Sequence, residues 1–462
     1  MSLRKIRPGS QTARPVARQP VGRLLGASLY RPWFDEVATT ALTEWLFPMS
    51  RAWAAAVAAE GEVARFRQAL PELGRLSSLD QIVARVHERK LQHDVAAANW
   101  RAAMFAANEP GQRELKRLER QRRLAAFRLA AERRRFLPAL WAAAIPPVNW
   151  RIASLADLEA RHGARLTAGA DAFAPPRPMP AVARSHAIER KDLRVYWLNL
   201  PAPALSPPCW AKVYEPLAVP NPPTVVFLHG IGVEMDIWPQ TRDVANMLAQ
   251  QGLRVIQHEG LWHGRRCEAG WFGGEQVLAT APLGLLDYMQ ATVMEAAILT
   301  AWARGQGGGP VGIGGISLGA LSAQKALSVA AALPAAARPD AALLIAPGGG
   351  LRRIALESAL TVRIGLPQAL ARHGWRPSDL ERWLPLVDPV AAPTLDPSRI
   401  VVAMGTVDHI AHYDDARRVI QDWGVPPGNV RLARKGHFSV SLDAAWLEPS
   451  ARRLAAILRQ TG

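Results

Sequence analysis

Residues 311–319 read Val-Gly-Ile-Gly-Gly-Ile-Ser-Leu-Gly, and this short segment limits most strongly what the chain can fold into. Its apolar start is typical of a strand, and helix-forming residues 320–327 follow the glycine at its end. A turn this tight between strand and helix leaves no room for side chains beside the serine, so Gly315 and Gly319 flank Ser317. Gly-rich turns are common, so the five residues alone are a weak signal. The strand before and the helix after them indicate a nucleophile elbow.

From about residue 191 onward, apolar strands alternate with helices. We expect strands at 195–198, 210–214, 224–228, 253–256, 341–346, 400–404 and 430–432 besides the elbow strand, and helices at 240–251 and 285–304. This alternation predicts an α/β fold with a mostly parallel sheet covered by helices on both faces. The carboxyl ends of parallel strands meet at one edge of such a sheet, where functional groups gather.

A serine hydroxyl needs a base within hydrogen-bond reach and a third group that orients the base. Asp408 follows the strand at 400–404, and His437 follows the last strand, so both lie at the same sheet edge as Ser317. We predict His437 as the base and Asp408 as its orienting acid, in the order Ser, Asp, His. Alternative acids remain in the same part of the chain: Asp388, Asp414 and Asp415.

The segment Leu228-His229-Gly230-Ile231-Gly232 follows the strand at 224–228. Glycines here let the backbone approach a substrate carbonyl and direct an N–H group at its oxygen. We expect an oxyanion hole from the N–H of Leu318 and the N–H of either Ile231 or Gly232. His229 is expected to be structural.

Taken together, Phe227-Leu228-His229-Gly230, Gly315–Gly319, Gly405–Asp408 and Gly436-His437-Phe438 resemble the α/β-hydrolase superfamily, over roughly residues 190–462. The resemblance implies an eight-stranded sheet, esterase-type chemistry, and no metal or organic cofactor. One segment departs from the pattern: Trp262-His263-Gly264 replaces the Gly-His-Gly stretch of many members, and two arginines follow it. The histidines also lack paired metal-ligand spacing.

Several residues are candidates for the substrate pocket: Trp238, His263, Arg265 and Trp271. Arg265 can bind a carboxylate or phosphate, although an internally paired loop is the simpler interpretation, and His263 can equally be structural. A cap or insertion is expected at 348–398, whose tryptophans, Trp375 and Trp383, favour hydrophobic acyl groups or pack a small core of their own.

The first 190 residues differ in composition and in predicted secondary structure from the rest of the chain. We expect residues 1–30, which are rich in Arg and free of acids, to form a flexible basic arm; the same composition also resembles a mitochondrial transit peptide. Residues 31–172 predict a helical domain, with helices at 38–59 (broken at Pro48), 79–107, 112–140 and 155–162. A proline-rich linker at 173–190 separates it from the hydrolase domain at 191–462.

Charge is concentrated in the same part. The net charge is +17, and residues 1–190 hold 31 Lys/Arg against 17 Asp/Glu. The stretch 112–136 alone holds ten Lys/Arg and three Glu. Three interpretations are open: a solvated face, docking on an anionic membrane surface, or contact with nucleic acid, which no motif supports. Two separated cysteines and the lack of a long apolar run favour a cytoplasmic protein, with peripheral membrane contact as an option.

The sequence therefore predicts a serine hydrolase that cleaves carboxylic esters of small molecules or lipids through Ser317, His437 and Asp408. Two alternatives stay open. An acyltransferase would use the same three residues with an alcohol in place of water. A non-catalytic binding protein would keep the fold without the reaction.

Overall fold

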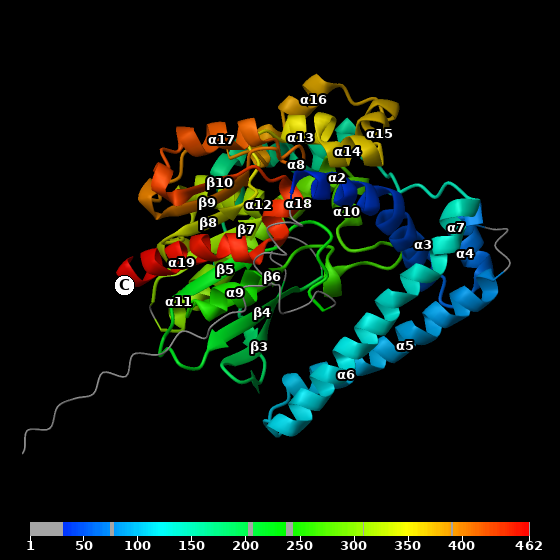
Figure 1. Cartoon of the computed structure of the whole chain (residues 1–462), viewed down its shortest axis with the longest axis horizontal. Coiled ribbons are helices and arrows are strands. Elements are labelled where there is room, and N and C mark those ends of the chain that lie inside the picture. Colours follow the sequence, from blue (N-terminus) through cyan, green and yellow to red (C-terminus); the bar gives the residue numbers. More distant parts are fainter. Residues whose placement is uncertain are drawn as a thin grey trace, which may run out of the picture.

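The computed structural model describes residues 31–73, 78–201, 207–236, 244–307, 309–389 and 391–461. A central sheet carries helices on both faces, and a long helical hairpin from the N-terminal part projects beside it (Figure 1). The expected α/β class, with helices preceding a mostly parallel sheet, is confirmed.

Ten strands form the sheet in the order β1-β3-β4-β6-β5-β7-β8-β9-β10, with β2 paired to β3. The strands are β1 Ala183–Arg184, β2 Ile188–Glu189, β3 Leu193–Leu200, β4 Cys209–Pro216, β5 Thr224–Leu228, β6 Arg254–Glu259, β7 Val311–Ile316, β8 Ala342–Ile345, β9 Ile400–Gly405 and β10 Val430–Ala433. β4 is antiparallel to both β3 and β6. The remaining neighbours from β6 to β10 pair in parallel. The carboxyl ends of β5, β7 and β9 therefore lie at one edge, which is where Ser317 begins its turn.

Two helical layers bury the sheet, whose central strands β5, β6, β8 and β9 are buried along their whole length. On one face lie α9 (Val244–Gln250) and α19 (Ala444–Thr461), which share a core with the strands. On the other lie α11 (Leu283–Gly305) and α12 (Leu318–Ser328). The near-continuous apolar strands of the sequence follow from this burial on both faces.

The N-terminal part begins with three helical segments in direct succession. They are α2 Pro32–Thr40, the π-helix η1 Ala41–Leu46 and α3 Phe47–Ala58. The predicted break at Pro48 was wrong, because the helical backbone runs without interruption from η1 into α3, with Pro48 in the first turn of α3. The π-helical turn directly before α3 accommodates a residue that lacks a backbone N–H.

The helices that follow are α4 Val63–Ala69, α5 Leu79–Met104, α6 Gln112–Ala131, α7 Leu137–Ala142 and α8 Leu155–Ala168, with 3-10 turns at Glu132–Phe136 and Gly169–Phe173. The helix predicted at 112–140 is therefore divided, because the 3-10 turn separates α6 from α7. α8 extends beyond the predicted 155–162 and ends at Gly169, which has a positive φ. These helices share buried contacts with the sheet: Phe47 and Ala54 belong to the same core as strands β4 and β5. The division into two domains at 173–190 stays a prediction.

Four short helices fill the insertion between β8 and β9: α13 Leu351–Glu357, α14 Ala359–Ile364, α15 Leu366–Arg372 and α16 Pro377–Glu381. Three further helices are α10 Glu275–Ala279, α17 Tyr413–Asp422 and α18 His437–Leu442. Among the described helices, none has the length and apolarity to cross a bilayer. The thiols of Cys209 and Cys267 are both free.

Candidate active site

Ser317 lies in the turn between β7 and α12 with φ 56° and ψ −122°, a backbone conformation that residues other than glycine rarely adopt. A Cβ atom added at Gly319 would lie 2.2 Å from the carbonyl oxygen of Leu228, and one at Gly315 would lie 2.1 Å from that of Gly319. Both positions therefore need glycine for helix α12 to start this close to β5. The turn projects the Ser317 side chain away from the sheet, as the sequence predicts for a nucleophile elbow.

Three predicted residues come together around His437. Its Nε2 lies 2.7 Å from Oγ of Ser317, and its Nδ1 lies 2.7 Å from Oδ2 of Asp408. His437 and Asp408 are buried. A neutral imidazole that donates Nδ1–H to the carboxylate leaves Nε2 free to accept the serine proton. Side chains 91 and 29 positions apart in the sequence thus form one continuous hydrogen-bonded chain.

The charged forms of Asp408 and His437 stabilise each other. Burial acts to raise the pKa of Asp408, but His437 and the N–H groups of Ile410 and Ala411 outweigh it, so the pKa lies below its ordinary value. Burial acts to lower the pKa of His437, but the carboxylates of Asp408 and Asp35 outweigh it and raise this pKa above its ordinary value. Asp408 is therefore ionised whenever His437 titrates.

The alternative acids have other partners. Asp388 accepts the N–H of Leu351 at 2.9 Å, and Arg353 binds Asp415 at 3.2 Å. Asp414 is exposed on the first turn of α17. Of the candidates, Asp408 is the one that the structure brings to His437.

The predicted oxyanion loop lies beside the serine. A Cβ at Gly230 would lie 3.3 Å from Cβ of Ser317. The N–H of Gly232 donates to Nε2 of His263 at 3.1 Å, so it is already occupied. Leu318 is the first residue of α12, where an N–H has no partner inside its helix. The geometry thus favours Ile231 over Gly232 as the companion of Leu318.

His263 holds this loop in place. Its Nδ1–H donates to the carbonyl of Leu261 at 2.9 Å while Nε2 accepts from Gly232. The ring is fully buried, and burial lowers its pKa to about 4, so it stays neutral and keeps both bonds. His229 is similar, accepting the N–H of Gly260 at Nε2. Both histidines have all their ring nitrogens engaged by backbone.

Two of the remaining pocket candidates, Arg265 and Trp271, have partners other than Ser317 and His437. Arg265 forms ion pairs with Glu259 at 3.0 Å and with Asp236 at 3.3 Å, as an internally paired loop would. Trp271 packs on the edge of the main core with the guanidinium of Arg151 over its ring. Trp238 lies outside the described residues. Substrate contact by these residues stays a prediction.

Two cavities open on the Ser317–His437 pair. The first, of about 160 Å³, is almost wholly apolar and lies between α10, α11 and the cap helices. Its walls include Val277, Leu285, Leu351, Leu370, Trp383 and Leu384. Of the two cap tryptophans, Trp383 lines it, whereas the indole N–H of Trp375 donates to the carbonyl of Ala153.

The second cavity, of about 480 Å³, is more polar. The oxyanion loop forms one wall, and four residues from α3 and the π-helix before it form another: Leu42, Leu46, Phe47 and Ser50. These N-terminal residues lie more than 250 positions before Ser317. No motif in the sequence connects them to the serine, so sequence reasoning missed them.

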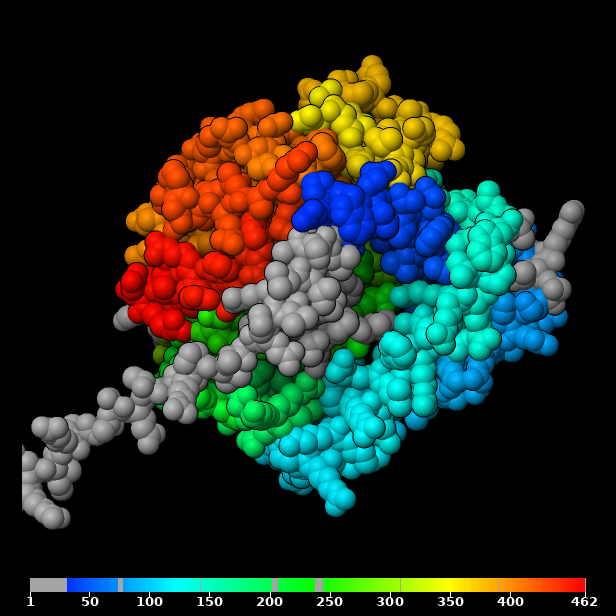
Figure 2. All heavy atoms as spheres, viewed as in Figure 1, coloured from blue at the N-terminus to red at the C-terminus, as the bar shows by residue number. Residues whose placement is uncertain are grey.

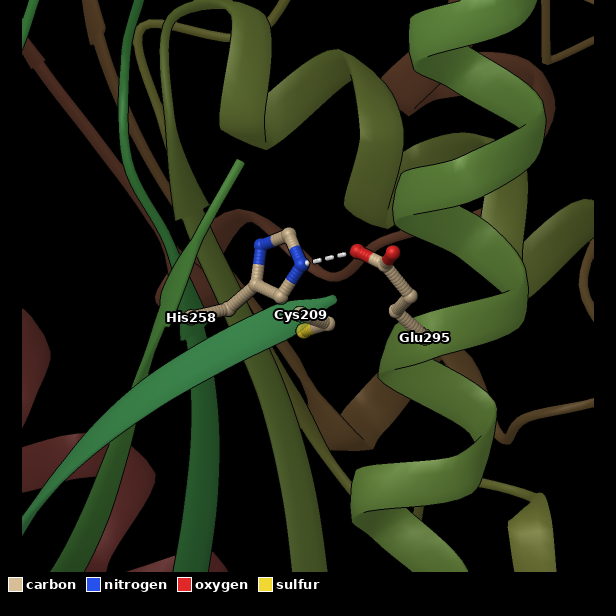
Figure 3. A group of neighbouring side chains, drawn as sticks. All are labelled: Cys209, His258 and Glu295. Carbon is tan, nitrogen blue, oxygen red and sulfur yellow. Dashed lines mark hydrogen bonds and ion pairs between the residues drawn. The ribbon is translucent and has the colours of Figure 1, made fainter. Parts of the chain in front are cut away.

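A separate buried group has a donor set suited to a metal ion. Cys209 on β4, His258 on β6 and Glu295 on α11 point their ligand atoms toward one another, all within 4.8 Å (Figure 3). However, Arg266 binds both oxygens of Glu295 at 2.7 and 2.8 Å, and His258 Nε2 lies 2.7 Å from the same carboxylate. Burial raises the pKa of the Cys209 thiol well above its usual value, whereas a metal would need the thiolate. Arg266 already supplies the positive charge, so this group fits a buried ion pair better than a metal centre.

Comparisons with known proteins give similarities to solved structures alone. No family model matches the chain, and no curated protein sequence matches it. Among solved structures, acetyl xylan esterase 1 from Thermoanaerobacterium sp. is similar at 12% identity and TM-score 0.44, over 62% of this chain and 94% of that one. Brefeldin A esterase, described as a bacterial homologue of human hormone-sensitive lipase, is similar at 18% identity and TM-score 0.40, over 68% and 88%. Carboxyl esterase 2 from Tuber melanosporum shares 16% identity at TM-score 0.41, over 62% and 91%.

Proposed function

We propose that the chain is a serine hydrolase that cleaves carboxylic esters. The observation that carries the proposal is the unbroken hydrogen-bonded chain from Asp408 through His437 to Ser317, with 2.7 Å at each step. Ser317 is also held in a strained turn directly before Leu318, whose N–H has no partner inside its own helix, and this is the second element that acyl transfer needs.

In the proposed reaction, Oγ of Ser317 attacks the ester carbonyl carbon while Nε2 of His437 takes the hydroxyl proton. The carbonyl oxygen becomes an oxyanion that accepts hydrogen bonds from the N–H groups of Leu318 and Ile231, and each donor lowers the barrier by about 3 kcal/mol. The tetrahedral intermediate then expels the alcohol, which leaves with the proton from His437.

The acyl-enzyme is hydrolysed by the same groups. His437 takes a proton from a water molecule, whose oxygen attacks the acyl carbon. The second tetrahedral intermediate releases the carboxylic acid, and Ser317 regains its proton from His437. Asp408 keeps the imidazole in the required tautomer and stabilises its protonated form in both halves.

The cavities favour an ester with an apolar acyl group. Because the smaller cavity is lined almost wholly by aliphatic side chains and Trp383, we propose that it takes the acyl chain. The larger, more polar cavity leaves room for the alcohol. Burying one methylene contributes about 0.8 kcal/mol, so kcat/KM should rise about fourfold per added carbon until the cavity is full.

Hydrolysis of p-nitrophenyl esters of graded chain length tests this proposal, together with labelling by a fluorophosphonate probe. We expect labelling of the wild type and of Ser328→Ala, a control on the same helix whose hydroxyl bonds the carbonyl of Lys325. We expect none for Ser317→Ala. Equal labelling of Ser317→Ala, or an unlabelled wild type, would contradict the hydrolase. Alcohol-dependent ester products would instead identify acyl transfer.

A further inference from the structure

Asp35 of α2 lies against the segment that carries His437, although 403 positions separate it from Phe438. Its Oδ1 accepts the backbone N–H of Phe438 at 2.6 Å and that of Ser439 at 3.2 Å. Its Oδ2 accepts the hydroxyl of Ser439. One carboxylate therefore binds the two residues that directly follow the base.

The residue before the base is also fitted to Asp35. A Cβ at Gly436 would lie 2.3 Å from Cγ of Asp35, so this glycine gives the carboxylate room to approach. The backbone on both sides of His437 thus lies against the same side chain. A movement of Asp35 would therefore shift Gly436 and Phe438, the two neighbours of His437, and with them the imidazole ring.

Helix α2 is held from its other side by the cap. Arg363 of α14 donates to the Glu36 carboxylate and, at 2.7 Å, to Oγ1 of Thr40. Figure 2 shows the blue N-terminal helix between the yellow cap and the orange and red C-terminal segments. Asp35 and Glu36 are therefore neighbours on one helix with different partners, which makes them a matched pair for mutation.

We propose that Asp35 is a positioning residue for the base, fixing the backbone of residues 437–439 so that the imidazole stays between Ser317 and Asp408. This inference rests on the proposed function. It assigns to the N-terminal helix a part in catalysis that the hydrolase motifs do not contain. The energetic reason is that a base displaced by about 1 Å can cost roughly a hundredfold in rate.

Asp35 also adds charge. The carboxylates that face His437 are Asp408 from the loop after β9 and Asp35 from α2, and both raise the pKa of the imidazole against the effect of burial. Removing the Asp35 charge should lower this pKa, whereas a purely structural contact would leave it in place. The titration of His437 therefore reports the charge of Asp35, and the labelling rate of Ser317 reports the position of the base.

The experiment compares Asp35→Asn, Asp35→Ala and the control Glu36→Gln in the full chain. Histidine-selective NMR gives the pKa of His437, assigned with His437→Gln, and fluorophosphonate labelling gives the reactivity of Ser317. We expect a lower pKa in both Asp35 variants and labelling slowed about tenfold or more in Asp35→Ala. Asp35→Asn keeps one acceptor oxygen, so it should fold and show the smaller rate loss. Glu36→Gln should match the wild type in both measurements.

The outcomes are distinct for the two proposals. If the wild type is labelled and both Asp35 variants titrate and react as it does, the positioning role is overturned while the hydrolase stands. If the pKa of His437 falls in the variants but the wild type is never labelled, the Asp35–His437 relation is supported and the hydrolase is overturned.

Discussion

Asp408 binds His437 with one carboxylate oxygen and the backbone of its own loop with the other. Oδ2 lies 2.7 Å from Nδ1 of His437, while Oδ1 accepts the N–H groups of Ile410 at 2.8 Å and Ala411 at 2.9 Å. The carboxylate cannot rotate without breaking these bonds. It therefore fixes both the orientation and the tautomer of the imidazole.

Replacing Asp408 by Asn should lower kcat on a p-nitrophenyl ester by about 10⁴-fold, because the amide favours the wrong imidazole tautomer. Steady-state kinetics measures the loss, and thermal unfolding checks that the variant is folded. Asp414→Asn, an exposed change on the first turn of α17, serves as the control and should keep full activity. A loss of less than tenfold in Asp408→Asn would assign the acid role to another residue.

The pH dependence should follow the base. His437 accepts a proton in the proposed reaction, so the enzyme is active only when the imidazole of His437 is neutral. Because Asp408 and Asp35 raise its pKa above the ordinary 6.5, kcat/KM should be lost on acidification with a midpoint above pH 6.5. A pH profile on a non-ionising ester measures this limb. The pKa of Asp408 is lowered, so this carboxylate is already ionised around pH 6.5. Its titration should therefore add no second fall in kcat/KM near that pH.

The sequence predicted the parts of the site that follow strands. Ser317 and Asp408 follow apolar strands, His437 follows the short last strand of the same parallel sheet, and such strands end at a common edge. It did not predict Asp35 or Leu42, because contacts between segments hundreds of residues apart depend on how α2 and α3 pack. Gly232 and Ile231 could not be separated either, since the bond from Gly232 to His263 becomes visible only in three dimensions.

Some of the cations of the predicted basic helix form ion pairs inside the molecule. Arg122 of α6 is buried and binds Glu119 at 3.0 Å and Asp236 at 2.5 Å, and Arg133 after the same helix binds Glu234. Glu234 and Asp236 follow the oxyanion loop directly. These ion pairs attach α6 to the segment that shapes the site, which the charge count alone could not indicate.

Arg122→Gln should therefore destabilise the protein by about 3 kcal/mol, because it leaves the buried carboxylate of Glu119 without its cation. Asp236 would lose one of its two cations and keep Arg265. Urea denaturation measures the free energy of unfolding. Arg117→Gln is the matched control on the same helix, since Arg117 pairs with Glu114 at the exposed surface, and it should unfold as the wild type does. Equal stability of the two variants would show that the buried cluster contributes little.

The α5–α6 hairpin carries exposed apolar and exposed basic side chains. Leu124 and Phe127 on α6 are 43% and 56% exposed, and Leu91 and Val95 on α5 are also exposed. Lys116, Arg120 and Arg128 of α6 are exposed as well. Apolar side chains beside basic ones suit an anionic membrane surface, where each Lys or Arg contributes about 1 kcal/mol.

We expect the full chain to sediment with phosphatidylglycerol vesicles, less so as salt is raised, and not with phosphatidylcholine vesicles. The double variant Lys116→Glu, Arg120→Glu should lose most of this binding, and Leu124→Ser with Phe127→Ser should weaken it at low salt. Leu432→Ser is the control, because Leu432 is 48% exposed on β10, away from the hairpin. Binding that ignores lipid charge or survives the α6 variants would make the hairpin an ordinary solvated surface, since attraction to an anionic membrane requires both the cations and the apolar side chains.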